Sequence, residues 1–155
     1  MKVSEIMTRT PITVWRNTPV QEVARLMVRH DISGIPVLEA DGTVAGVVSE
    51  DDLIVRHANL HLPTYVLYFT VRGEHEFEEE MRRALATKAD EVMSDHLYTI
   101  APDADIADAA TLMMDKHASP LPVVADGQLV GILSRADIVR LMAIEDERAG
   151  ESGAQ

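Results

Sequence analysis

Residues 46–53 read Gly-Val-Val-Ser-Glu-Asp-Asp-Leu, and residues 131–138 repeat the pattern as Gly-Ile-Leu-Ser-Arg-Ala-Asp-Ile. Shorter stretches ahead of each copy also correspond, in the same order: 5–7 with 91–93, 24–27 with 110–113, 33–37 with 119–123, and 41–42 with 126–127. The register is interrupted once, by an extra residue near Ala40. An internal repeat is more informative about the fold than any single predicted element, because a missed repeat leads to a wrong assignment of the whole fold. Two copies predict a pseudo-symmetric pair, and the cleft between its halves is the natural place for a ligand.

The composition narrows the range of functions. The chain has 155 residues, of which 46% are hydrophobic, so it has the size of one compact domain and enough apolar content for a core. Its net charge of −12 argues against nucleic acid and anionic membranes as partners, because both require a basic face. The absence of cysteine excludes disulfides and a cysteine nucleophile. With no signal-peptide pattern and no apolar run long enough to span a bilayer, we expect a cytoplasmic protein.

Each copy reads as strand, helix, strand, strand, helix, from apolar periodicity and turn residues. The first copy predicts strands over 12–14, 35–38 and 44–48, a turn at 41–42, and helices from Pro19 and from Glu50 toward His57. The second predicts strands over 98–100, 121–124 and 129–133, a turn at 126–127, and helices from Asp103 or Asp105 and from Arg135 to about Asp146. The fold class is therefore α/β with α+β character: two β-α-β-β-α repeats packed through their small sheets.

The predicted boundaries are repeat 1 over 1–57, a connector over 58–87, repeat 2 over 88–146 and a disordered tail over 147–155. The connector has no counterpart within the repeats, and its second part reads as a helix. Its aromatic residues are Tyr65, Tyr68, Phe69 and Phe77. These residues either pack back on the repeats or form a surface for a partner.

The order of motifs resembles a known family. Ile35-Pro36-Val37 followed by Gly46-x-x-Ser49-x-x-Asp52, within this order of elements, resembles the cystathionine-β-synthase (CBS) domain. Two such repeats resemble a stand-alone CBS pair, or Bateman module, and the resemblance covers most of residues 2–57 and 88–143. It implies two clefts that bind adenosine-containing ligands: AMP, ADP or ATP, and in some members S-adenosylmethionine or a dinucleotide. It also implies that Asp52 and Asp137 bind ribose hydroxyls, and that Ser49 and Ser134 contact ribose or phosphate.

The chemistry of these residues is compatible with that implication. A carboxylate can accept hydrogen bonds from both hydroxyls of a ribose, and a helix start that follows a serine presents backbone N–H groups to an anion. An apolar slot for a purine can come from either copy. The candidate slot residues are Ile12, Ile35, Pro36 and Val37, or Tyr98, Leu121, Pro122 and Val123.

A structural role explains the same spacing. Ser-x-x-Asp at a helix start is also an acidic relative of the capping box, in which the serine caps the helix and the aspartate favours its dipole. Spacing alone does not choose between a helix cap and a ligand site, and the two roles are compatible.

The two copies differ in charge. Arg135 follows Ser134, whereas Glu50 follows Ser49, and arginine suits phosphate while glutamate opposes it. Lys116-His117 corresponds to His30-Asp31, so the second copy is again the more basic. The sequence leaves open which cleft Arg135 serves, and a solvated residue in the first helical turn is the alternative.

No set of nucleophile, base and orienting group can be assembled, so we expect no catalytic residues and no enzyme. His57 and His61 lack a third ligand, so no metal site is expected, and no cofactor is required. Two functions remain: a regulatory sensor of adenine nucleotides, or a ligand-free module for dimerisation or protein interaction with an unknown effector. We expect a homodimer formed by helices 50–57 and 135–144. Their apolar residues are Leu53, Ile54, Ile138, Leu141 and Met142.

Overall fold

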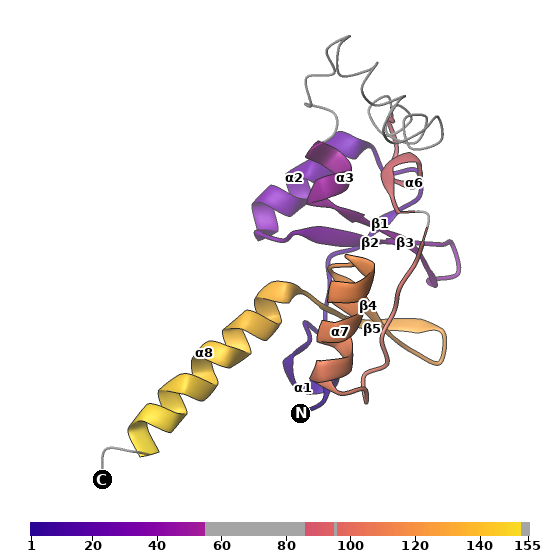
Figure 1. Cartoon of the computed structure of the whole chain (residues 1–155). Coiled ribbons are helices and arrows are strands. Elements are labelled where there is room, and N and C mark those ends of the chain that lie inside the picture. Colours follow the sequence, from indigo (N-terminus) through magenta and orange to yellow (C-terminus); the bar gives the residue numbers. More distant parts are fainter. Residues whose placement is uncertain (55–85, 95, 153–155) are drawn as a thin grey trace, which may run out of the picture.

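Each repeat folds around a short sheet flanked by helices. The computed structural model describes residues 1–54, 86–94 and 96–152. The first repeat contains α1 (Val3–Ile6), β1 (Val14–Trp15), α2 (Val20–His30), β2 (Gly34–Leu38), β3 (Val44–Ser49) and α3 (Glu50–Ile54). The second contains α6 (Ala89–Val92), α7 (Ile106–Lys116), β4 (Leu121–Ala125), β5 (Gln128–Leu133) and α8 (Arg135–Ser152). The predicted fold of two related α+β halves is confirmed, and the two small sheets face each other (Figure 1).

The sheets follow the predicted hairpins. β1 lies parallel to β2, while β2–β3 and β4–β5 are antiparallel. Gly42 and Gly127 have φ of 84° and 77° in the two hairpin turns, a conformation that glycine adopts without strain. The outer strands are shorter than predicted. β1 begins only at Val14, and the strand expected over 98–100 is reduced to one parallel bridge between Ile100 and Val123.

The leading segment of each repeat packs on the other repeat. The backbone N–H of Val3, in α1, donates to the carbonyl of Ala104 in the second repeat (3.0 Å). Conversely, the N–H of Ala89, in α6, donates to the carbonyl of Thr18 in the first repeat (2.9 Å). Each leading segment thereby supplies buried side chains to the opposite core. The two halves are interlocked rather than merely adjacent.

This exchange explains why glycine opens the repeated motif. A Cβ added to Gly46 would lie 2.7 Å from Sδ of Met93, which follows α6. A Cβ on Gly131 would lie 2.6 Å from Sδ of Met7 and 2.9 Å from the backbone oxygen of Thr8. These separations are shorter than van der Waals contact, so glycine is needed for the close approach of the opposite repeat's leading segment.

Two apolar cores result, each containing residues from both halves. The buried residues of the first are Val14, Val20, Val23, Met27, Ile35, Val37, Val48, Ala86, Ala89 and Val92. Those of the second are Val3, Ala109, Met113, Leu121, Val123 and Leu133. Fully burying a side chain such as valine or leucine contributes about 1.5–3 kcal/mol. Removing one leading segment would therefore open the core of the other repeat.

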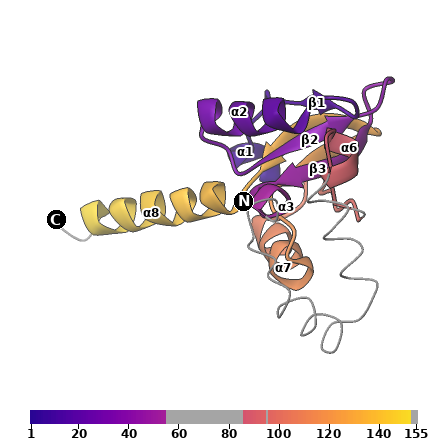
Figure 2. The same cartoon turned by 90° about the horizontal axis from the view of Figure 1, so that it is seen from above.

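The last helix is longer than predicted. α8 continues to Ser152, so the expected end near Asp146 and the disordered tail over 147–155 are wrong for residues 147–152. Glu147, Arg148 and Ala149 are good helix formers, which favours continuation of the helix. α8 projects away from the two sheets in both views (Figures 1 and 2). No described helix is long and apolar enough to cross a membrane. The connector aromatics, His57 and His61 lie outside the described residues.

Candidate functional site

The first Ser-x-x-Asp pair lies where a strand passes into a helix. Ser49 ends β3, and Asp52 stands in the first turn of α3. The backbone N–H of Ser49 (2.8 Å) and its hydroxyl (3.0 Å) both donate to Oδ2 of Asp52. Asp52 is only 8% exposed, and burial of a carboxylate requires such donors. The two hydrogen bonds therefore hold the carboxylate in one orientation.

The second pair repeats this geometry. The N–H and the hydroxyl of Ser134 each donate to Oδ2 of Asp137 at 2.7 Å. The N–H of Asp137 donates back to the Ser134 hydroxyl (3.3 Å), and Nη1 of Arg140 lies 3.0 Å from Oδ1 of Asp137. The helix-cap role is therefore present in the structure. It leaves room for a ligand, because a carboxylate offers about four acceptor positions.

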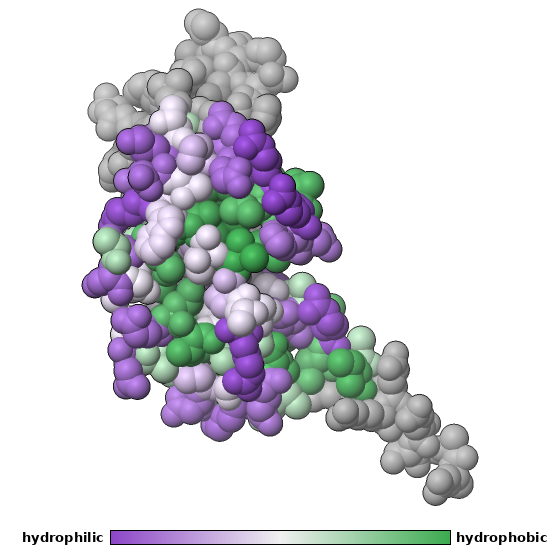
Figure 3. All heavy atoms as spheres, turned by 180° about the vertical axis from the view of Figure 1, so that it is seen from behind, coloured by the Kyte–Doolittle hydropathy of each residue, from purple (hydrophilic) through white to green (hydrophobic). Residues whose placement is uncertain are grey.

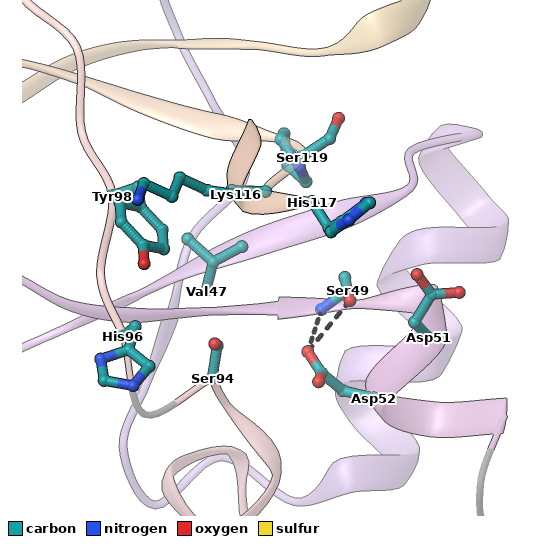
Figure 4. A pocket seen from close by; sticks show the side chains of 12 residues that line it. Val47, Ser49, Asp51, Asp52, Ser94, His96, Tyr98, Lys116, His117 and Ser119 are labelled. Carbon is teal, nitrogen blue, oxygen red and sulfur yellow. Dashed lines mark hydrogen bonds between the residues drawn. The ribbon is translucent and has the colours of Figure 1, made fainter. Parts of the chain in front are cut away.

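Each pair lies in a cleft whose opposite wall comes from the other repeat. The Asp52 cleft has a volume of about 200 Å³. Its lining residues are Val47, Ser49, Asp51, Asp52, Ser94, His96, Tyr98, Lys116, His117, Ala118, Ser119 and Pro120. Figure 4 shows Ser49 and Asp52 on one side, with Tyr98, Lys116 and His117 across from them. The cleft can therefore form only when both repeats are assembled.

The Asp137 cleft is its counterpart and is larger. Its volume is about 440 Å³, within the range of about 300–1,000 Å³ typical of ligand sites. Its lining residues are Thr8, Thr10, Pro11, Ile12, His30, Asp31, Ile32, Ser33, Gly34, Pro120, Ile132, Ser134, Ala136, Asp137 and Arg140. Most of these stand at repeat positions that also line the Asp52 cleft. The two clefts are thus related by the same pseudo-symmetry as the sequence.

Of the predicted slot residues, the structure places two on cleft walls. Tyr98 lines the cleft of Asp52, and Ile12 lines the cleft of Asp137, so each faces the motif of the opposite repeat. The other six line neither cleft: Ile35, Pro36, Val37, Leu121, Pro122 and Val123 are fully buried in β2 and β4. The predicted slot is corrected at these positions. Strands covered on both faces keep their side chains inside the cores.

Arg135 lines neither cleft. It borders a hollow of about 300 Å³ with Ser33, Ser49, Glu50, Asp51, Ser119 and Ala136. Ser49 also lines the Asp52 cleft and Ser33 the Asp137 cleft, so the hollow adjoins both. The guanidinium Nη2 of Arg135 lies 3.5 Å from the backbone oxygen of Met113. Arg135 is thus exposed and borders a hollow that adjoins both clefts.

Sequence reasoning did not assign several cleft residues. Lys116 and His117 end α7 and line the Asp52 cleft, whereas His30 and Asp31 end α2 and line the Asp137 cleft. His96 also lines the Asp52 cleft and had no signal of its own. The register of the repeat paired Lys116-His117 with His30-Asp31, but only the packing of the two halves shows which cleft each of these residues enters.

Comparisons with known proteins agree with this architecture. The chain is 37% identical to protein MJ1426 of Methanocaldococcus jannaschii over 154 residues, covering 92% of this chain and 91% of that protein. It is 30% identical to the CBS domain-containing protein YhcV of Bacillus subtilis, covering 97% and 91%.

Solved structures give the same result. The structure of CBSX2 in complex with AMP is 27% identical, with a TM-score of 0.75 over 94% of this chain and 98% of that one. The CBS domain pair of protein MJ0100, solved with 5′-methylthioadenosine and S-adenosyl-L-methionine, is 22% identical with a TM-score of 0.69 over 94% and 98%, and shows the fold alone. The CBS domain family matches twice, over residues 3–58 and 89–144, and this chain therefore belongs to the CBS domain family as a tandem pair.

Proposed function

We propose that this chain is a non-catalytic regulatory module that binds adenosine-containing nucleotides in the Asp52 and Asp137 clefts. The observation that carries the proposal is the pairing within each cleft. A fixed carboxylate of one repeat lies across from an apolar side chain of the other, Tyr98 or Ile12. The carboxylate suits the hydroxyls of a ribose, and the apolar side chain suits the face of a purine.

The relatives support the same class of ligand. CBSX2, at 27% identity, has been solved with AMP. AMP, ADP and ATP are the first candidates, and S-adenosylmethionine and a dinucleotide are the others. A cytoplasmic location stays a prediction from the sequence.

A melting-shift screen tests the proposal. The intact chain, shown to be free of co-purified nucleotide, is heated with AMP, ADP, ATP, a reduced dinucleotide or S-adenosylmethionine. A ligand at one hundred times its dissociation constant stabilises the folded state by about 2.7 kcal/mol. For a chain of this size the melting temperature should rise on the order of 5–10 °C. No shift with any of these ligands would contradict the proposal.

Substitution of the aspartates separates binding from capping. Asp52→Ala and Asp137→Ala should each remove most binding at one cleft, because each unpaired ribose hydroxyl costs about 1–3 kcal/mol, a factor of about 5 to 150 in affinity. Each should also lower stability by about 1 kcal/mol without ligand, because a helix-start hydrogen bond is lost. Asp52→Asn and Asp137→Asn are the controls, since an amide oxygen can still accept from the serine. If alanine reduced stability but left the nucleotide shift intact, the aspartates would be helix caps only.

A second function, self-association, is supported by the helices that follow the two motifs. Ile54 on α3 is 64% exposed, and Val139, Met142 and Ile144 on α8 are 63%, 63% and 44% exposed. Figure 3 shows apolar side chains at the surface of this part of α8. Leu53, Ile138 and Leu141 are half-buried and contribute less. A homodimer through these two helices would cover the exposed side chains.

Sedimentation at micromolar concentration tests this second function. The wild type should sediment as a dimer, and Val139→Glu with Met142→Glu should shift it to monomer. Trp15→Lys, at an exposed apolar residue on β1, is the matched control and should leave the dimer intact. A monomeric wild type would exclude the interface.

A further inference from the structure

The two clefts share a backbone frame but differ in the charge presented at one wall. His117 and Asp31 occupy equivalent positions after α7 and α2, and both adopt the left-handed conformation, with φ of 50° and 51°. The backbone at these two positions is therefore nearly the same. Each residue is exposed and lines its cleft, His117 in the Asp52 cleft and Asp31 in the Asp137 cleft. Any difference in ligand preference at this position comes from the side chain.

The residues that precede His117 and Asp31 also differ in charge between the two clefts. Lys116 lines the Asp52 cleft, and Figure 4 shows its side chain running along the wall toward Tyr98. The equivalent residue in the Asp137 cleft is His30. The Asp52 cleft thus presents lysine and histidine where the Asp137 cleft presents histidine and aspartate. His96 adds a further imidazole to the Asp52 cleft, at a position that is Thr10 in the other.

With the histidines neutral, the described lining of each cleft carries one cation and two carboxylates, so the clefts differ in where these charges lie and not in their sum. Asp51 adds a carboxylate at the edge of the Asp52 cleft, where the other cleft has Ala136. Arg140 is the one arginine lining the Asp137 cleft within the described residues, and it is paired with Asp137 at 3.0 Å. This ion pair places the charge of Arg140 beside the motif carboxylate. Lys116 forms no ion pair within the described residues, so its ammonium group can meet a ligand.

Resting on the proposed function, we propose that the two clefts select adenosyl ligands of different charge. The Asp52 cleft takes phosphorylated ligands, with Lys116 and His117 as the specificity-determining residues. The Asp137 cleft takes uncharged or cationic ones, because Asp31 stands where His117 stands in its counterpart. A phosphate monoester carries a charge of about −1.5 to −2 at pH 7. Lysine binds such a group as a point charge, whereas a like charge placed opposite it discriminates against the ligand.

The repeat provides an exchange experiment. His117→Asp gives the Asp52 cleft the residue of its counterpart, and Asp31→His does the reverse. Histidine and aspartate both tolerate the left-handed conformation, so both variants should fold. Melting temperatures without ligand check this. Calorimetric titration with AMP, adenosine and S-adenosylmethionine then measures each affinity, in backgrounds with Asp137→Ala or Asp52→Ala that leave one cleft active.

The expected result is a crossed change. In the Asp137→Ala background, His117→Asp should lower the affinity for AMP by about tenfold. The affinity for adenosine should change by no more than about twofold. In the Asp52→Ala background, Asp31→His should strengthen AMP relative to S-adenosylmethionine. Lys116→Ala should weaken AMP in the same direction as His117→Asp.

Other outcomes separate this inference from the proposed function. If AMP binds both clefts and neither exchange alters the ratio of AMP to adenosine affinity, the inference is wrong and the proposed function stands. If AMP and adenosine weaken together, residue 117 acts on the shape of the cleft and not on charge, which also overturns the inference. If no adenosyl ligand binds the wild type, both fail.

Discussion

In the cores, Val48 and Leu133 occupy equivalent positions of the two repeats, and both are fully buried apolar side chains. On the cleft walls, Lys116 and His30 are also equivalent, but both are exposed and their side chains differ chemically. The cores agree because a close-packed interior tolerates little change in volume or polarity. The cleft walls meet solvent, so a change of charge there costs the fold little. Pseudo-symmetry in this molecule is therefore a property of its packing, and it does not make the two clefts chemically alike.

The largest expected effect comes from breaking the pair itself. A fragment ending at Lys88 lacks α6, whose Ala89 and Val92 are fully buried in the first core, and it leaves Val3 without the second core. Such a fragment should lose cooperative unfolding or self-associate to replace the missing half. Circular dichroism melting with sedimentation measures both. A monomeric fragment with a sharp melting transition would show that the repeats are separable.

The two motif glycines test the exchange of leading segments more locally. Gly131→Ala should lower the free energy of unfolding by about 1–3 kcal/mol, because the new Cβ meets a backbone oxygen that cannot move aside. Gly46→Ala should cost less, because the atoms nearest to its Cβ all belong to the flexible side chain of Met93. Urea denaturation measures the difference. In a Met93→Ala background the further loss caused by Gly46→Ala should largely disappear, whereas in a Met7→Ala background part of the loss caused by Gly131→Ala should remain.

Substitutions of Arg135 test whether the hollow that it borders contributes to nucleotide binding. Arg135→Glu should weaken ADP and ATP by about two- to fivefold, because an exposed ion pair contributes about 0.2–1 kcal/mol. Adenosine should bind as before. Glu50→Arg, at the equivalent position, is the reverse variant and should strengthen the same ligands. If both variants bound every ligand with the affinity of the wild type, Arg135 would be a solvated helix residue with no role in binding.

The smallest effect concerns the docking of α6. The backbone N–H of Thr87 donates to the carboxylate of Glu91 (2.8 Å), and this hydrogen bond holds the pKa of Glu91 below its ordinary value of 4.5. A lowered pKa stabilises the fold above the unfolded value, and the contribution disappears as the pH falls through the folded value. The melting temperature of Glu91→Gln should therefore be slightly below that of the wild type at neutral pH, and this difference should disappear as the pH falls through the lowered pKa of Glu91. Glu50→Gln, an exposed carboxylate that accepts no hydrogen bond from the described residues, should show no such gap. A gap that persists at low pH would exclude the carboxylate as its cause.

The sequence by itself determined the repeat, and with it the order of elements and the two hairpins. Local signals sufficed for these features: alternating apolar residues predict strands, and Asp-Gly pairs predict turns. It also placed Ser49 with Asp52 and Ser134 with Asp137 at helix starts. The local pattern predicted outer strands that were too long, because the length of a strand depends on pairing and packing with its neighbours as well as on its own residues.

Only the tertiary structure decided how the halves combine. The leading segments cross to the opposite repeat, so Tyr98 meets the motif of Asp52, and Ile12 meets that of Asp137. The same packing buries the strand residues expected in the clefts and leaves Arg135 between them. These arrangements depend on contacts between residues far apart in the chain. Periodicity reports which face of an element is apolar, but it does not report which partner covers that face.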